Sequence, residues 1–193
     1  MKKQMICISG NIAVGKTEVA ALIAKDLGYG LYKASESFRS LARENNMDLV
    51  TFNDYVKSNP DIDRNIEAKT KEVIDSNTHM IIDARLGFFL EPKAFRVYMI
   101  ADEAVAADRL FKAAVTRGKE EEYSSIEQAR EAIRIREASE QERYLKLYNV
   151  DIHNMDNYDY VIDTTDLTAE IVASKIIRAY KVWCEVDFNE GDI

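Results

Sequence analysis

The sequence has 193 residues, 47% of them hydrophobic, and its 26 Lys plus Arg against 34 Asp plus Glu give a net charge of −8 at pH 7. This length suffices for one hydrophobic core, and the acidic balance argues against general binding to nucleic acid. Two histidines are too few for a histidine-rich metal centre, and no segment approaches the length of a membrane-spanning helix. We therefore expect a cytoplasmic protein with reduced thiols that binds neither nucleic acid nor a membrane.

The first half of the chain begins with a strand and a helix. An apolar, β-prone run at residues 5–8 predicts the strand, and apolar residues at helical spacing up to Leu27 predict the helix, which Gly28 ends. A second strand is expected at 31–34, and Ser35 or Ser37 is expected to cap the helix that follows. Three helices are predicted in this region: one closed by residues 45–46, one broken at 59–60, and one that begins near residue 61.

The second half of the chain continues the alternation. Strands are expected at 79–83, 95–100 and 160–163, with helices at about 103–117 and 125–147 between the last two. An amphipathic helix from 168 to about 183 follows, and then a frayed acidic tail. Alternation of this kind predicts an α/β domain in which a five-stranded parallel sheet lies between two helical layers.

The most informative segment is G-x-x-x-x-G-K-T, which lies between the first strand and the first helix. Glycines let such a loop direct several N–H groups at one anion, and the new helix adds its positive N-terminal end. Lys16 is expected to act on the β- and γ-phosphates of ATP as a catalytic cation, and the Thr17 hydroxyl to ligate Mg²⁺. The motif predicts a three-layer P-loop NTPase fold, with the nucleotide held by Gly10, Asn11, Ile12, Ala13, Val14, Gly15, Lys16 and Thr17.

A carboxylate at the end of a buried strand is a candidate magnesium ligand. Asp83 follows an apolar run and is expected on a strand near the phosphate loop. In other phosphate-loop proteins, a carboxylate that helps to bind Mg²⁺ lies on a strand beside the loop in the same way. We predict that Asp83 helps to hold Mg²⁺ through water, and the alternative is an ordinary solvent-facing aspartate.

Two helical excursions, at about residues 36–76 and 107–147, follow strands and are therefore expected over the carboxyl ends of the sheet, where ligands bind. We interpret the first as an acceptor-binding insertion and the second as a lid. The whole chain, residues 1–193, is then a single domain, and its core consists of residues 1–35, 77–106 and 155–185. The lid would close over both substrates to exclude water, with Gly118 and its neighbours absorbing the backbone change. The alternative is a rigid helical pair.

Arginines indicate the class of reaction. Transfer to a second phosphate requires cations that hold two polyanions together, and the guanidinium fork matches phosphate oxygens. Arg136 and Arg143, seven residues apart, share one helix face, whereas Arg130 and Arg134 suit solvated positions paired with glutamates. The candidates lie in both excursions and beside the predicted magnesium ligand: Arg39, Arg85, Arg109, Arg134, Arg136 and Arg143.

Five segments resemble the archaeal-type cytidylate kinases, in the order and spacing of that family and over nearly the whole chain. They are S-E-S-F-R-S-L-A at 35–42, N-P-D-I-D at 59–63, D-A-R-L-G-F at 83–88, R-E-A-S-E with the following R-Y and Y-N-V-D-I at 136–152, and Y-D-Y-V-I-D-T at 158–164. The resemblance implies a nucleoside monophosphate kinase that uses ATP and Mg²⁺ to phosphorylate CMP or dCMP. The chain departs from the family in its phosphate loop, G-N-I-A-V-G-K-T instead of G-P-P-G-S-G-K-T, and at Ala84, where the family has glycine.

Carried over position by position, the resemblance implies that Arg39 and Arg85 grip the acceptor phosphate. Ser35 and Glu137 would lie near the acceptor base or sugar. Two further cations, Arg136 and Arg109, would stabilise the charge on the phosphoryl group during its transfer.

Two alternatives to this reaction stay open. One is a P-loop kinase for another small acceptor, such as a deoxynucleoside, and the other is a regulatory nucleotide-binding protein. The sequence lacks the N-K-x-D segment expected of a GTPase switch. We expect ATP and a nucleoside monophosphate as the binding partners, and a monomer or weak homodimer.

Overall fold

The computed structural model describes residues 3–117 and 122–189. Within these residues a single parallel sheet has the strand order β2-β3-β1-β4-β5. Its strands are β1 (Met5–Gly10), β2 (Gly30–Lys33), β3 (Met80–Asp83), β4 (Phe95–Ile100) and β5 (Tyr160–Asp163). The predicted five-stranded parallel sheet is confirmed, and β4 and β5 have the predicted bounds.

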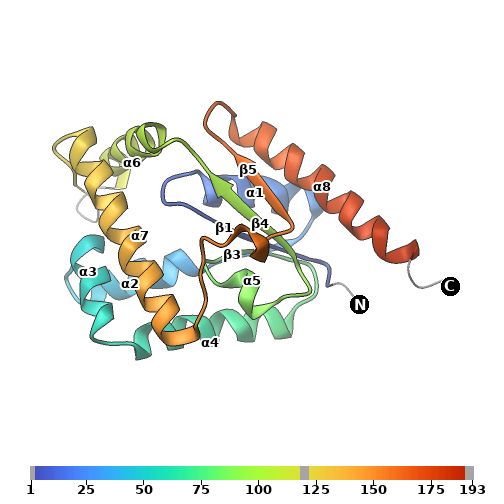
Figure 1. Ribbon diagram of the computed structural model, residues 1–193, viewed down its shortest axis with the longest axis horizontal. Helices are drawn as coiled ribbons and strands as arrows, with labels where there is room; N and C mark the ends of the chain where they lie inside the picture. Colours follow the sequence, from blue (N-terminus) through green and yellow to red (C-terminus); the bar gives the residue numbers. More distant parts are fainter. Residues whose placement is uncertain (1–2, 118–121, 190–193) are drawn as a thin grey trace.

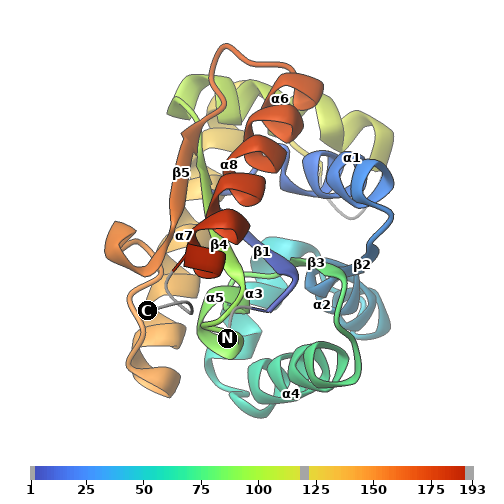
Figure 2. The ribbon, with the colours of Figure 1, turned by 90° about the vertical axis from the view of Figure 1, so that its right-hand side faces the viewer.

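Helices cover both faces of the sheet because successive β1 side chains point to opposite sides. Ile6 and Ile8 face the layer formed by α1 (Lys16–Leu27) and α8 (Ala169–Asn189). Met5 and Cys7 face the other layer, which contains α2 (Ala34–Glu44), α4 (Asp61–Ser76) and the short α5 (Gly87–Leu90). Figures 1 and 2 show these layers from two sides. The three-layer fold predicted from the sequence is confirmed.

The remaining helices form the two excursions. The first contains α2, α3 (Leu49–Lys57) and α4, and the second contains α6 (Glu103–Arg117) and α7 (Ile126–Tyr148); a 3₁₀ turn, η2 (Met155–Asn157), precedes β5. Figure 1 shows α7 crossing from α6 to the region of α3 and α4. The predicted loop at 118–122, including the hinge at Gly118, lies outside the described residues except for Glu122.

Several predicted boundaries are wrong. β2 ends at Lys33, where it pairs with Asp83, and α2 begins directly at Ala34. Ser35 and Ser37 therefore lie inside the helix, and neither caps it. The last helix runs to Asn189, beyond the predicted end near residue 183, and Trp183 packs against the sheet core. The single turn α5 was not predicted, since four residues are too few to show helical periodicity.

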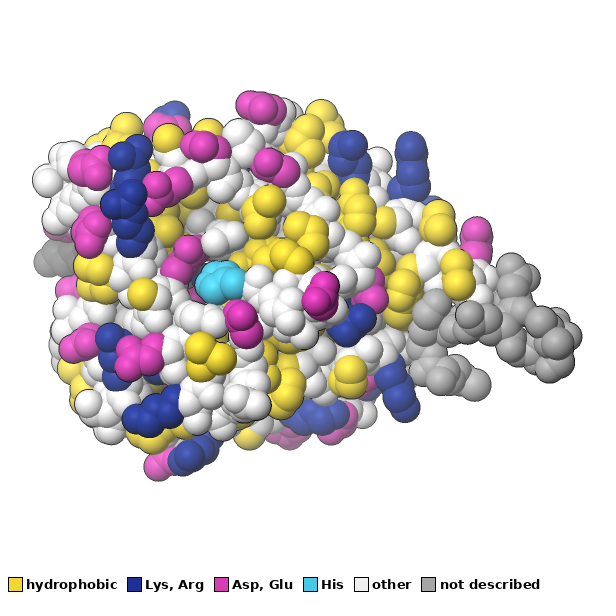
Figure 3. All heavy atoms as spheres, in the orientation of Figure 1, with side chains coloured by type: hydrophobic (Ala, Val, Ile, Leu, Met, Phe, Trp, Pro, Cys, Tyr) yellow, Lys and Arg dark blue, Asp and Glu magenta, His cyan; other side chains and the backbone are white. Residues whose placement is uncertain are grey.

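No helix among the described residues is both long enough and apolar enough to cross a membrane. In the space-filling view, basic and acidic side chains are interspersed over the face shown (Figure 3). Surface charge is therefore mixed on this face.

Candidate active site

A cavity of about 740 Å³ lies at the carboxyl ends of the strands, between the phosphate loop, the first excursion and the helices α6 and α7. It brings together residues that are far apart in the sequence. Three predicted site residues, Gly10, Asn11 and Glu137, are not part of its wall. The predicted site residues that line it are Ile12, Ala13, Val14, Gly15, Lys16, Thr17, Ser35, Arg39, Asp83, Arg85, Arg109 and Arg136.

The phosphate loop has a backbone that only certain residues can adopt. Gly10 has φ 143°, and a Cβ there would lie 2.2 Å from the carbonyl oxygen of Met99. Gly15 has φ 88° and precedes α1, whose N-terminus has no side-chain cap. Ala13 also has a positive φ, 62°, which is unusual for a residue with a side chain. The loop thus leaves the first N–H groups of α1 available to an anion.

Lys16 lies over this loop. Its Nζ donates hydrogen bonds to the carbonyl oxygens of Gly10, at 2.9 Å, and of Asn11. Burial, together with the nearby Arg85 guanidinium, lowers the pKa of Lys16 to about 7. A bound polyphosphate would favour the charged form of this amine, because an opposite charge stabilises it.

Thr17 and Asp83 meet at the end of the loop. The Thr17 hydroxyl donates to Oδ2 of Asp83 at 2.7 Å, and both residues line the cavity. Among the described residues there is no cluster of three or more His, Cys, Asp or Glu that could hold a metal by itself. This donor set fits Mg²⁺, which binds hard oxygen ligands and takes most of them from phosphates and water.

Arg85 connects the loop to α7. It donates through Nη1 to the carbonyl oxygen of Gly10, and its Nε lies 2.6 Å from Oε2 of Glu140. Burial opposes the charge on Arg85, but Glu140 outweighs it and raises the arginine pKa. Ser9, which sequence reasoning missed, donates to the carbonyl oxygens of Ala84 and Arg85 at 3.0 and 3.1 Å and so positions this turn.

The other predicted cations occupy separate walls of the cavity. Arg39 is half-buried on α2, one turn beyond Ser35. Arg136 is buried on α7, four residues before Glu140, whose pKa it helps to lower. Arg109, on α6, donates to the Thr164 carbonyl oxygen at 2.7 Å and to the Thr164 hydroxyl at 3.1 Å, so its guanidinium is held at the loop after β5.

Glu137 contacts the phosphate loop. Its Oε1 accepts hydrogen bonds from Asn11 Nδ2 at 3.0 Å and from the backbone N–H of Ile12 at 2.8 Å. The structure therefore places the Glu137 carboxylate against the phosphate loop, outside the cavity wall. The reason is helical geometry, because consecutive residues on α7 point in directions about 100° apart and Arg136 takes the direction of the cavity. The predicted place of Glu137 near the acceptor base or sugar stays a prediction.

A buried polar network between α7, α3 and α4 was not predicted. Arg143 Nε lies 2.8 Å from Asp63 Oδ2, and Arg143 Nη1 donates to Ser139 Oγ at 2.8 Å and to Asn53 Oδ1 at 3.2 Å. Burial raises the pKa of Asp63, although Arg143 opposes this effect. Asp63 and Glu67 lie four residues apart on α4 and line the same cavity. Their spacing was the sequence signal that could have indicated this network.

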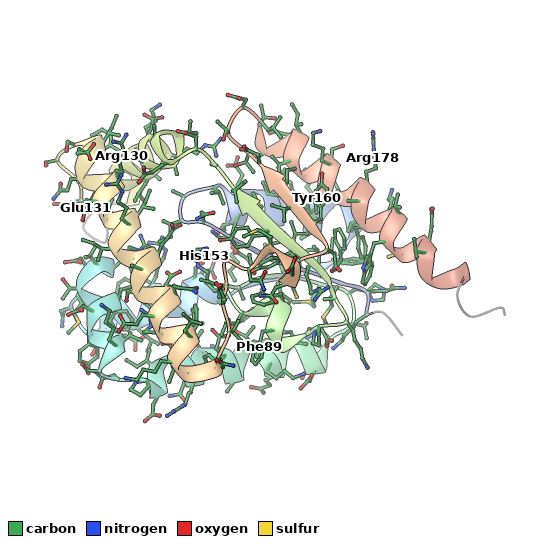
Figure 4. The ribbon with its side chains drawn as sticks, viewed as in Figure 1. Phe89, Arg130, Glu131, His153, Tyr160 and Arg178 are labelled. Carbon is green, nitrogen blue, oxygen red and sulfur yellow. The ribbon has the colours of Figure 1, made fainter. Side chains whose placement is uncertain are left out.

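The outer face of α7 carries ordinary surface ion pairs, as predicted. Arg130 Nη1 lies 2.8 Å from Glu127 Oε2, and Arg134 Nε lies 2.5 Å from Glu103 Oε1. Figure 4 shows Arg130 and Glu131 on the N-terminal part of this helix. Arg134 therefore has a surface role here, in contrast to the buried Arg136 and Arg143.

Comparisons with known proteins agree with this geometry. Residues 5–166 match the model of the cytidylate kinase-like family. A cytidylate kinase of Archaeoglobus fulgidus is 34% identical over 92% of this chain and 94% of its own length, and one of Methanobrevibacter smithii is 30% identical over 92% and 99%. Among solved structures, a gluconokinase from Sinorhizobium meliloti has a TM-score of 0.64 at 12% identity over 98% of this chain and 99% of its own, a likeness of fold alone.

Proposed function

The chain belongs to the cytidylate kinase-like family, and from this premise we propose that it transfers the γ-phosphoryl group of ATP to CMP or dCMP. The products are ADP and the corresponding nucleoside diphosphate. Curated relatives of this length and similarity are cytidylate kinases, which supports the choice of acceptor.

The observation that carries the proposal is the continuity of the cavity. One wall is the phosphate loop, with Arg85 bonded to it, and the wall formed by α2 holds Arg39. Two polyanions can therefore lie in one enclosed space, with cations between them. A nucleotide switch without a second substrate would not need this second set of cavity-lining arginines.

Alignment and charge are sufficient for the chemistry. An oxygen of the acceptor phosphate is already a nucleophile, so it attacks the γ-phosphorus and ADP departs without a strong protein base. We assign Lys16 to the β- and γ-phosphates, Arg39 and Arg85 to the acceptor phosphate, and Arg136 to the charge on the group in transit. Arg109, held by Thr164 on another wall, is assigned to the donor nucleotide's side of the cavity.

We propose Thr17 and Asp83 as the residues that hold Mg²⁺. The ion, when bound with ATP, would neutralise charge on the phosphate oxygens. The 2.7 Å contact between the threonine hydroxyl and the carboxylate supports this assignment, since it places two oxygen ligands together beside the loop.

We propose that the second excursion acts as a lid that excludes water. Ser139 and Arg143 are bonded to α3 and α4, so closure would either move the insertion with α7 or rearrange these bonds. Amide hydrogen exchange should show protection across 107–147 rising strongly with a bisubstrate analogue and less with ATP alone. Equal, high protection in the free protein would favour the rigid pair.

The proposed reaction is tested by a coupled ADP-release assay against nucleoside monophosphates and unphosphorylated nucleosides. CMP and dCMP should give the highest kcat/KM. A preference for a nucleoside would instead indicate another small-acceptor kinase. ATP binding without ADP release for any acceptor would indicate a regulatory nucleotide-binding protein. The expected cytoplasmic location and monomeric or weakly dimeric state stay predictions.

A further inference from the structure

Two acidic side chains line the acceptor end of the cavity, beyond the arginines assigned to phosphate. Asp63 and Glu67 are four residues apart on α4, so they lie on one face of that helix. Both are buried, with exposed fractions of 2% and 6%, and both contribute to the cavity wall. No step assigned above to phosphate binding or phosphoryl transfer uses them.

Glu67 differs from Asp63 in its hydrogen bonds. Asp63 is held by Arg143 at 2.8 Å. The Oε2 atom of Glu67 is buried and has no hydrogen-bond partner among the residues that the structure describes. Leaving a buried polar atom unsatisfied costs on the order of 1–3 kcal/mol, and a bound ligand can supply the missing partner. An unsatisfied carboxyl group facing a substrate cavity therefore points to a polar group on the substrate.

The surroundings of Glu67 determine its protonation state. Asp63 lies one turn away on the same helix, and α7 contributes Tyr144, Tyr148 and Arg143 to the same region. Burial, with a smaller contribution from the Asp63 charge, raises the pKa of Glu67 to about 8. At neutral pH this side chain is then mostly a carboxylic acid, which can donate one hydrogen bond and accept others.

We propose that Asp63 and Glu67 bind the hydrogen-bonding edge of the acceptor base and select cytosine over uracil. This inference rests on the proposed function, because it names the base subsite of the same reaction. Cytosine presents an amino group with two N–H donors beside a ring nitrogen that accepts. The acid pair offers acceptor oxygens for the amino group, and the Glu67 hydroxyl can donate to the ring nitrogen.

Uracil has the opposite pattern at this edge. It places a carbonyl oxygen where cytosine has the amino group, and an N–H where cytosine has an acceptor. Asp63, whose Oδ2 accepts a hydrogen bond from Arg143, presents acceptor oxygens at this edge, so the uracil carbonyl oxygen would face another acceptor. Sites whose buried polar groups are left unpaired by the wrong substrate discriminate strongly against it.

The test compares CMP with UMP, which differ only at this edge. Glu67→Leu keeps the side chain buried but removes its hydrogen bonds. It should lower kcat/KM for CMP at least tenfold, mainly by raising KM. The ratio of kcat/KM for CMP to kcat/KM for UMP should also fall at least tenfold. Glu67→Gln, whose amide can both donate and accept, should retain most of the ratio. The KM for ATP should change less than threefold in both variants.

Glu72 provides the matched control, because it is exposed on the same helix and does not line the cavity. Glu72→Leu and Glu72→Gln should leave the ratio unchanged. A folded Glu67→Leu protein that keeps the wild-type ratio would overturn the inference while leaving the kinase proposal intact. A wild-type protein that phosphorylates no nucleoside monophosphate would instead overturn the proposed function.

Discussion

The phosphate loop and the acceptor end of the cavity are adjacent, but they are built in different ways. The loop is one continuous segment whose shape comes from backbone conformations, such as those of Gly10 and Gly15. The acceptor end is made of side chains from separate helices, held by the buried pair of Asp63 and Arg143. We therefore expect substitutions in the loop to affect chemistry more than stability, and substitutions at the acceptor end to affect both.

The largest effect should come from Arg143→Ala. It leaves Asp63 buried without its ionic partner and should lower the free energy of unfolding by about 4 kcal/mol, as loss of one partner of a buried pair typically does. Urea unfolding at pH 7 measures this. Arg134→Ala on the same helix removes only an exposed pair with Glu103 and should cost less than about 1 kcal/mol. Equal costs for the two variants would contradict the comparison.

Lys16→Ala should have the opposite profile. Its ammonium stabilises charge that develops in the transition state, so turnover should fall about 100-fold or more, on the order of 3 kcal/mol. The free energy of unfolding should change little, because the Lys16 ammonium hydrogen-bonds to loop carbonyls. Lys25→Ala, at the far end of α1, is the control for the helix. Near-normal turnover in a folded Lys16→Ala protein would remove the phosphotransferase assignment.

Glu67 should make stability depend on pH. Its pKa is about 8 in the folded protein against 4.5 unfolded, so the folded state holds the proton more tightly between these values. The stability contributed by the protonated group is present below pH 4.5 and is lost as pH rises towards 8. The wild type should therefore lose roughly 2–3 kcal/mol more than Glu67→Gln between pH 5 and pH 8 in urea unfolding. Glu72→Gln should follow the wild type, and identical slopes for all three would contradict the prediction.

Arg39→Lys should affect one substrate. The charge remains but the two-pronged geometry is lost, so kcat/KM for the monophosphate should fall roughly 30-fold, or about 2 kcal/mol. The KM for ATP should change less than threefold in steady-state assays. Arg43→Lys, one turn later and exposed, serves as the control. If ATP affinity fell and acceptor affinity did not, Arg39 would belong to the donor nucleotide.

The smallest effect concerns the backbone of the loop. Ala13 has φ 62°, a conformation that costs a residue with a Cβ about 1 kcal/mol. Ala13→Gly should relieve this strain and raise the free energy of unfolding by up to about 1 kcal/mol in urea. Ala84→Gly, at a buried position outside the loop, is the control. A loss of stability in Ala13→Gly would show that the loop does not store strain at this position.

The order of strands and helices could be predicted from the sequence because each depends on local periodicity. Residues 95–100 and 160–163 are apolar runs between turn signals, and the structure gives them the predicted bounds. The start of α2 was wrong because pairing of Lys33 with Asp83, which is non-local, fixes where β2 ends. The predicted end of α8 was also wrong, because the helix continues beyond residue 183 to Asn189.

For the site, the sequence by itself determined the phosphate loop and the family, which the match over residues 5–166 confirms. A continuous motif needs no partner to set its backbone. Only the tertiary structure decided that Glu137 contacts the phosphate loop, and that Asp63 and Glu67 line the cavity. Burial, pairing and raised pKa values arise when separate helices enclose a side chain, and no local pattern in the sequence encodes that enclosure.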